Sequence, residues 1–228
     1  MKMTKKKVLA LALCLCLLAT VAAGSLAWFS AEDSVTNQFL IADSTGDDKA
    51  DFSVDVKESE DDGTNWSDNG LTYEDILPGQ TLPKLAKVIN TSTGDTYSQY
   101  IRVTVTLTGM NWQAAGEGDF TKSLTGLNAD LHLVATDYDN TTQTNTAVFY
   151  LNKELDPGDE VTAFEGIKIP GKFDNQGGEF NLTNFDLTVK AEAVQSEFIL
   201  DESVTYANVW QEAQAAFEAA NMKHPLEP

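Results

Sequence analysis

Histidine, a common acid–base and metal-binding residue, occurs only twice in this 228-residue chain, at positions far apart in the sequence. The two histidines are His132, in an alternating apolar and polar segment, and His224, beside Pro225. Neither belongs to a His-Glu-x-x-His motif, which places two metal ligands and a general base on one helix. No Gly-x-Ser-x-Gly motif presents a serine nucleophile. The sequence therefore predicts no catalytic residue, with a zinc site or a glycosidase carboxylate pair as alternatives.

Acidic residues cluster in two segments rich in Asp, Asn, Ser and Gly, residues 43–51 and 58–70, which we expect to be surface loops. Carboxylates on such loops are the hard oxygen ligands that calcium prefers. Neither segment has the ligand spacing of an EF-hand, so solvated loops are favoured over calcium sites and no other cofactor is expected. The calcium candidates are Asp43, Asp47, Asp48 and Asp51 in the first segment, and Asp61, Asp62 and Asp68 in the second.

The first 27 residues have the pattern of a secretory signal peptide. A lysine-rich head (residues 2–7) precedes an apolar run (residues 8–23) and the small residues of Gly24-Ser25-Leu26-Ala27. We expect cleavage between Ala27 and Trp28, release to the cell exterior, and contact with a membrane only during export. The alternative is an uncleaved membrane anchor, although the run is shorter than the roughly 20 residues of a spanning helix.

Cysteine content and charge restrict the kinds of site and partner that the chain can have after cleavage. Cys14 and Cys16 are its only cysteines, so cleavage leaves no disulfide and no thiolate ligand. Eleven Lys and Arg then face 35 Asp and Glu, a net charge of about −24. Such a surface repels nucleic acid and anionic lipid, and it keeps subunits apart until salt or divalent cations screen it.

The elements that would position any site are short strands. Apolar and polar residues alternate with the period of two that a half-buried strand requires. We expect strands within 52–56, 85–89, 100–108, 131–135, 147–151, 162–169 and 185–193. Several short strands separated by turns predict one all-β domain, residues 28–200, folded as an antiparallel sandwich or barrel.

Two Pro-Gly pairs predict turns in this domain, and the spacing of apolar residues changes to that of a helix at the C-terminus. Pro78-Gly79 and Pro157-Gly158 predict type II turns before the strands near 85 and 162. The region 108–128 is interrupted by glycines and is expected to be irregular. Residues 201–228 are expected to form a C-terminal amphipathic helix and tail that pack on the domain, with an apolar stripe of Val209, Trp210, Ala213, Phe217 and Ala220.

Several short motifs, taken in order, resemble the TasA/camelysin (CalY) family. The junction 24–30, Gly-Ser-Leu-Ala-Trp-Phe-Ser, is similar to signals cut by the dedicated SipW-type peptidase. A Pro-Gly turn at 77–81, Val-Ile-Asn-Thr at 88–91 and Tyr-Ser-Gln-Tyr-Ile-Arg-Val-Thr-Val at 97–105 resemble the first half of the family. The second half is matched at 149–151, 157–158, 164–170 and 191–195.

The resemblance implies a jelly-roll sandwich and a secreted Gram-positive protein of the cell surface or biofilm matrix. TasA-like members assemble into fibres in which the N-terminal segment of one subunit completes a sheet of its neighbour. Residues 28–41 are the candidate donor strand, with Phe29, Ala31, Val35, Phe39 and Ile41 on one largely apolar face. The alternative is an ordinary first strand that pairs within its own domain.

Three functions follow from the resemblance and the composition. The leading hypothesis is a non-enzymatic subunit that self-associates into extracellular fibres by donor-strand exchange. The second is a camelysin-like secreted metalloprotease, although this chain has no recognisable set of zinc ligands. The third is a monomeric surface adhesin.

Overall fold

The computed structural model describes residues 52–93, 98–110, 112, 120–173, 184–196 and 205–211, and the backbone of two N-terminal strands. The predicted signal peptide, residues 1–27, lies outside these residues, as does most of the predicted C-terminal helix. In the part of the chain that is described, no helix is long and apolar enough to cross a membrane.

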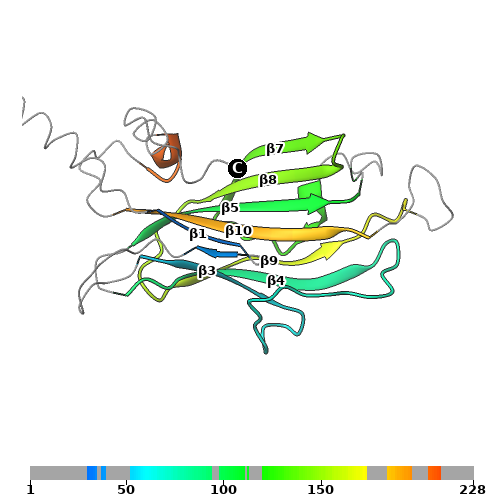
Figure 1. Ribbon diagram of the computed structural model, residues 1–228, viewed down its shortest axis with the longest axis horizontal. Coiled ribbons are helices and arrows are strands. Elements are labelled where there is room, and N and C mark those ends of the chain that lie inside the picture. The colour runs from blue at the N-terminus through cyan, green and yellow to red at the C-terminus, as the bar shows by residue number, and fades with distance from the viewer. Residues whose placement is uncertain are drawn as a thin grey trace, which may run out of the picture.

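Two antiparallel sheets face each other and confirm the predicted all-β sandwich (Figure 1). The larger has the order β2-β1-β10-β5-β8-β7 and the smaller has the order β3-β4-β9-β6. The strands are β1 Ser30–Ser34, β2 Asn37–Phe39, β3 Val54–Ser59, β4 Thr81–Asn90, β5 Gln99–Thr108, β6 Leu124–Thr125, β7 Leu131–Asp139, β8 Thr144–Leu151, β9 Glu160–Lys168 and β10 Asp186–Gln195. The finer jelly-roll assignment stays a prediction.

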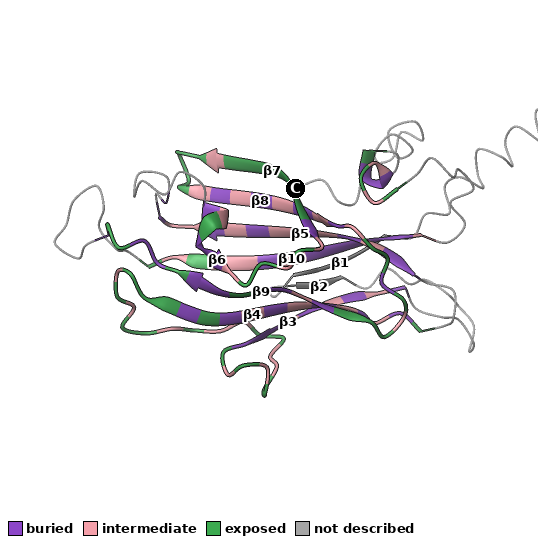
Figure 2. Ribbon diagram, turned by 180° about the vertical axis from the view of Figure 1, so that it is seen from behind, coloured by how far each residue is buried: buried purple, intermediate pink, exposed green. Residues whose placement is uncertain are grey.

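Alternating side chains explain why these segments became strands. Ile101, Val103, Val105 and Leu107 of β5 are buried, while the residues between them are half-exposed. Across the register, β10 places Val189 opposite Val105 and Ala191 opposite Val103, so apolar residues of both strands share the inner face. Figure 2 shows this alternation of buried and intermediate residues along β5 and β8.

The core is closed by a residue from the segment expected to be irregular. Trp112 is fully buried, and its ring lies 5.7 Å from Phe173 and 6.1 Å from Phe185, edge to face. Its Nε1 donates to Ser123 Oγ at 2.9 Å, at the end of a short 3-10 helix, Phe120–Ser123. This hydrogen bond satisfies the only polar atom that the tryptophan brings into the core.

Both Pro-Gly turns are confirmed. The N–H of Gln80 donates to the carbonyl of Leu77, and the N–H of Asp159 donates to the carbonyl of Asp156. Gly79 and Gly158 have φ of 81° and 87°, the positive value that the third position of a type II turn requires. Each turn therefore fixes where the next long strand, β4 or β9, begins.

Strands β4 and β7 extend furthest beyond their predicted ranges. β4 begins at Thr81 and runs through Pro83, where its register against β9 shifts, so the proline sits at an irregularity that does not need its N–H. β7 continues to Asp139, and all its residues from His132 to Asp137 are exposed (Figure 2). A strand exposed on both faces has no alternation, which explains why its length could not be predicted.

Candidate functional site

A groove lies where β10 and β4 extend beyond the strands, β1 and β3, that pair with them. β1 pairs with β10 only from Lys190 to Val194, and β3 pairs with β4 only from Leu85 to Asn90. Among the described residues, Asp186–Thr188 of β10 and Thr81–Lys84 of β4 therefore have no strand neighbour on those sides. A cavity of about 1040 Å³ lies between these two edges. Its size is at the upper end of the roughly 300–1,000 Å³ typical of ligand sites.

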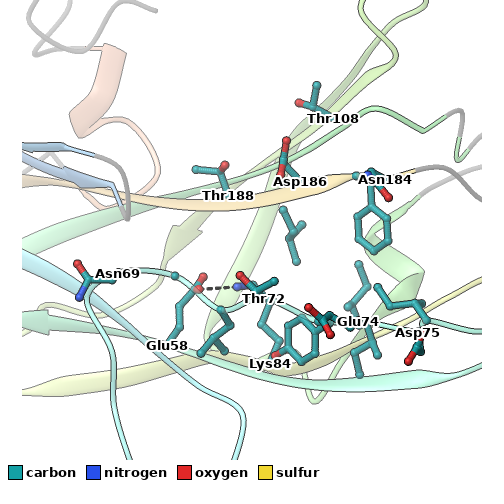
Figure 3. Close-up of a pocket in the computed structure, with 18 residues that line it drawn as sticks. Glu58, Asn69, Thr72, Glu74, Asp75, Lys84, Thr108, Asn184, Asp186 and Thr188 are labelled. Atoms are coloured by element: carbon teal, nitrogen blue, oxygen red, sulfur yellow. Dashed lines mark ion pairs between the residues drawn. The ribbon is translucent and has the colours of Figure 1, made fainter.

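One wall of the groove is a loop and the other is the end of a strand. Residues 69–76 form the first wall, and residues 184–188 with Thr108 form the second. In Figure 3, Asp186 and Thr188 lie across the opening from Thr72 and Glu74. The hydroxyl of Tyr73 donates to the carbonyl of Pro83 and so attaches the loop to the edge of β4. The floor is apolar and includes Leu82 and Ile167, both buried.

A buried ion pair lies at one end of this floor. Lys84 Nζ is 2.5 Å from Glu58 Oε2, and the two side chains are 6% and 1% exposed. Burial lowers the pKa of Lys84 below 10.5, and the neighbouring Glu58 carboxylate offsets part of that shift. Glu58 is held in place by its backbone, which exchanges hydrogen bonds of 2.9 and 2.8 Å with Ser67.

The second carboxylate oxygen of Glu58 has no partner among the described residues. Oε1 is buried and accepts no hydrogen bond from any described residue, although the side chain lines the groove. Figure 3 shows the carboxylate pointing into the space between β4 and β10, with its ion pair to Lys84 drawn as a dashed line. A buried acceptor without a donor is costly, by about 1–3 kcal/mol, and a ligand with a donor would satisfy it.

Sequence reasoning missed this groove. Glu58 and Lys84 stand 26 positions apart, and only the pairing of β3 with β4 brings them together. The one signal in the sequence is that each charged residue stands on a strand face that is otherwise apolar. Glu58 follows Val54 and Val56, and Lys84 stands between Leu82 and Ala86. A charged residue at an inward position indicates either that the strand register was assigned wrongly or that the residue belongs to a buried ion pair.

The predicted donor segment forms a hairpin at the edge of the larger sheet. β1 pairs antiparallel with β10 of the same chain, with Ala31 opposite Ala193 and Glu32 opposite Glu192. The chain then reverses, and β2 returns along β1 with Phe39 opposite Glu32. The segment is therefore two short strands instead of the single extended strand envisaged over 28–41. Phe29, Val35 and Ile41 lie outside the described residues, as do the side chains of Ala31 and Phe39.

The predicted calcium residues do not form a described site. Asp43, Asp47, Asp48 and Asp51 all lie outside the described residues. Asp61 accepts hydrogen bonds from the N–H of Asn65 at 2.8 Å and from Ser59 Oγ at 2.7 Å, and these lower its pKa to about 2. Asp68 instead pairs with Lys57 at 3.2 Å. Within the described ranges, no three His, Cys, Asp or Glu side chains gather as metal ligands.

His132 lies on the exposed edge strand β7, away from the groove. Its Nε2 is 3.1 Å from Asn152 Nδ2, and its ring lies 5.8 Å from that of Tyr206. The exposure of His132 agrees with the prediction of an outward strand position. His224 lies outside the part of the chain that is described.

The described part of the C-terminal segment packs on the outer face of the larger sheet. Val209–Gln211 is helical, and Val209 and Trp210 are buried against Tyr100, Tyr150 and Val194. The guanidinium of Arg102 lies 4.7 Å from the centre of the Trp210 ring, and its Nε is 2.5 Å from Glu192 Oε2. The segment therefore covers β10 where β1 pairs with it.

No protein family, curated protein or solved structure matches the chain.

Proposed function

We propose that the protein is a secreted structural subunit of extracellular fibres or matrix, assembled by exchange of its N-terminal strand between neighbouring subunits. Removal of residues 1–27 by a signal peptidase of the SipW type would free the strand. The observation that carries the proposal is the position of β1, a five-residue strand next to the N-terminal end of the domain that pairs with β10 near the sheet edge.

Exchange of such a strand is physically simple. A neighbour's β1 carries the same sequence and can take the same register on β10, so the hydrogen bonds broken in one subunit are re-formed in the next. When the donated strand reaches a different subunit from the one that donates to it, the contact is head-to-tail and propagates as a filament. The rest of the sandwich, β3 to β10, keeps its pairing throughout.

Charge supports an assembly that responds to conditions. A net charge of about −24 after cleavage repels subunits from one another at low ionic strength. At about 0.15 M salt the screening length is about 8 Å, so assembly should accelerate when salt or calcium is added.

The test is a double variant, Phe29→Asp with Phe39→Asp, examined by electron microscopy across a protein and calcium concentration series. We expect a folded monomer that forms no fibres, because two charges are placed in the exchanged segment. The matched control is Leu77→Asp with Leu127→Asp, which adds the same charges at two exposed leucines outside that segment and should leave fibres intact. Fibres from the first variant that match wild type would refute the proposal.

The same purified protein distinguishes the other two hypotheses. A camelysin-like protease predicts casein cleavage that a chelator abolishes and that is lost on changing His132. An adhesin predicts a monomer at every concentration that still binds cells or matrix.

A further inference from the structure

We propose that the groove between residues 69–76 and 184–188 binds an extended peptide of a different protein, and that a lysine or arginine side chain of this peptide pairs with Glu58. This goes beyond the proposed assembly, which uses the stretch Lys190–Val194 of β10 and not the groove.

The backbone of β10 provides the first half of the site. On the side away from β5, Asp186–Thr188 pair with no described strand, and they line the groove directly. In an antiparallel strand alternate residues direct both their N–H and C=O groups to the same neighbour, so this edge offers main-chain donors and acceptors. Residues 184–188 extend over about 17 Å, enough to hold a peptide of five residues by strand addition.

Glu58 provides the second half. Its Oε1 is buried and has no donor in the described part of the chain, while Oε2 already pairs with Lys84. A cationic side chain that enters the groove can donate to this free oxygen. The resulting charge-assisted hydrogen bond is stronger than a neutral one, because one charge is desolvated and fixed in place before binding.

The rim of the groove selects for positive charge. Glu74, Asp75 and Asp186 are exposed along it, and Lys84 is the only cation among the described lining residues. Because Lys84 is already paired, the groove carries excess negative charge near a low-dielectric floor, which concentrates cations.

The same charge argues against a second copy of this chain as the occupant. Its N-terminal segment, residues 28–41, contains Glu32 and Asp33 and no lysine or arginine. A donated strand of that composition would place acidic groups against an acidic rim and would bring no cationic side chain to Glu58.

The apolar floor sets the rest of the pattern. Leu82, Ile167 and Leu187 line the groove between the polar rims. Because successive residues of an extended peptide point to opposite sides, every second side chain would face this floor. The expected ligand alternates apolar and polar residues, with one inward position occupied by lysine or arginine.

The probe is the pentapeptide Val-Thr-Lys-Thr-Val, in which both valines and the lysine share one face, acetylated, amidated and fluorescently labelled, titrated with the purified protein by fluorescence anisotropy. Three comparison peptides are used: one with norleucine in place of lysine, one with N-methylated backbone amides at alternate positions, and one with the sequence of residues 28–41. We expect the lysine peptide to bind at least about tenfold more tightly than the norleucine peptide, and N-methylation to abolish binding.

Variants test whether the preference for the lysine peptide arises in the groove. Asp186→Asn combined with Glu74→Gln changes only exposed rim residues and should reduce the preference for lysine severalfold. Asp137→Asn, an exposed residue of β7, is the matched control and should change nothing. Glu58→Gln should remove most of the preference, and the rim variant carries the test if Glu58→Gln fails to fold.

The inference would be overturned by equal binding of the lysine and norleucine peptides, or by no binding at millimolar concentration. Tighter binding of the 28–41 peptide would also overturn it and would identify a second copy as the occupant. Failure of fibres to form would refute the proposed assembly but leave this result unaffected.

Discussion

Replacing Lys84 by methionine should destabilise the protein far more than most single substitutions at lysine. The change keeps the side chain as far as its fourth atom and removes the charged nitrogen, so Glu58 is left as a carboxylate that is 1% exposed, with neither oxygen paired to a described residue. Removing one partner of a buried ion pair costs about 3–5 kcal/mol in the free energy of unfolding. Such a loss is a large fraction of the roughly 5–15 kcal/mol that stabilises a typical domain.

The matched control is Lys57→Met in the neighbouring strand β3. Lys57 lies 3.2 Å from Asp68, but that carboxylate is 69% exposed, so water replaces the lost partner. A pair of this kind contributes about 0–1 kcal/mol. Urea unfolding followed by tryptophan fluorescence gives both free energies under the same conditions.

A double variant tests whether the loss of stability comes from the unpaired charge of Glu58. Lys84→Met with Glu58→Leu removes both charges, and it should recover most of the stability lost in Lys84→Met, because no unpaired ion stays in the interior. The reasoning is refuted if Lys84→Met costs no more than Lys57→Met, or if the double variant is no more stable than Lys84→Met alone.

Three further predictions concern single positions. Asp61 has a pKa of about 2 in the folded protein against 3.8 for the free group. Its stabilising contribution is therefore complete above pH 3.8 and lost as the pH falls toward 2, so wild type and Asp61→Asn should converge in stability over that window in acid titrations of unfolding. Gly109 has φ of 97°, and an added Cβ would lie 2.8 Å from the carbonyl oxygen of Asn184, whereas Gly158 has φ of 87° and open space around it. Gly109→Ala should lower the melting temperature more than Gly158→Ala, by the equivalent of at least about 1 kcal/mol, and equal values would contradict the steric argument. Trp210→Ala should remove the ring over Arg102, so that hydrogen exchange at Tyr206–Gln211 accelerates while β5 stays protected.

The sequence predicts the class of fold because local patterns determine it. Buried and half-exposed residues of β5 alternate without a break over its ten positions, and the glycines of both Pro-Gly turns have the positive φ that their turn type requires. These features depend on neighbouring residues alone, so a single sequence contains them.

Features that depend on pairing between distant strands could not be predicted. The register of β3 against β4 places Glu58 beside Lys84, and the short overlap of β1 with β10 leaves the groove open. Trp112 belongs to a segment without periodicity, yet it is part of the core because Phe173, after β9, and Phe185, just before β10, pack against its ring. The donor segment was expected as one strand, but its parity gave no indication of the reversal between Ser34 and Asn37.

The account depends most on strand exchange, and a pair of engineered cysteines tests it directly. Ala31 lies opposite Ala193 in the register of β1 and β10, at a separation suited to a disulfide, so Ala31→Cys with Ala193→Cys should crosslink wherever these strands pair. Removal of residues 1–27 also removes Cys14 and Cys16, so no other thiol competes in the cleaved protein. After oxidation of protein under fibre-forming conditions, we predict a ladder of covalent multimers on a non-reducing gel, collapsing to monomer on reduction. A single internally crosslinked monomer band from those fibres would show that β1 stays in its own subunit, and would contradict the account.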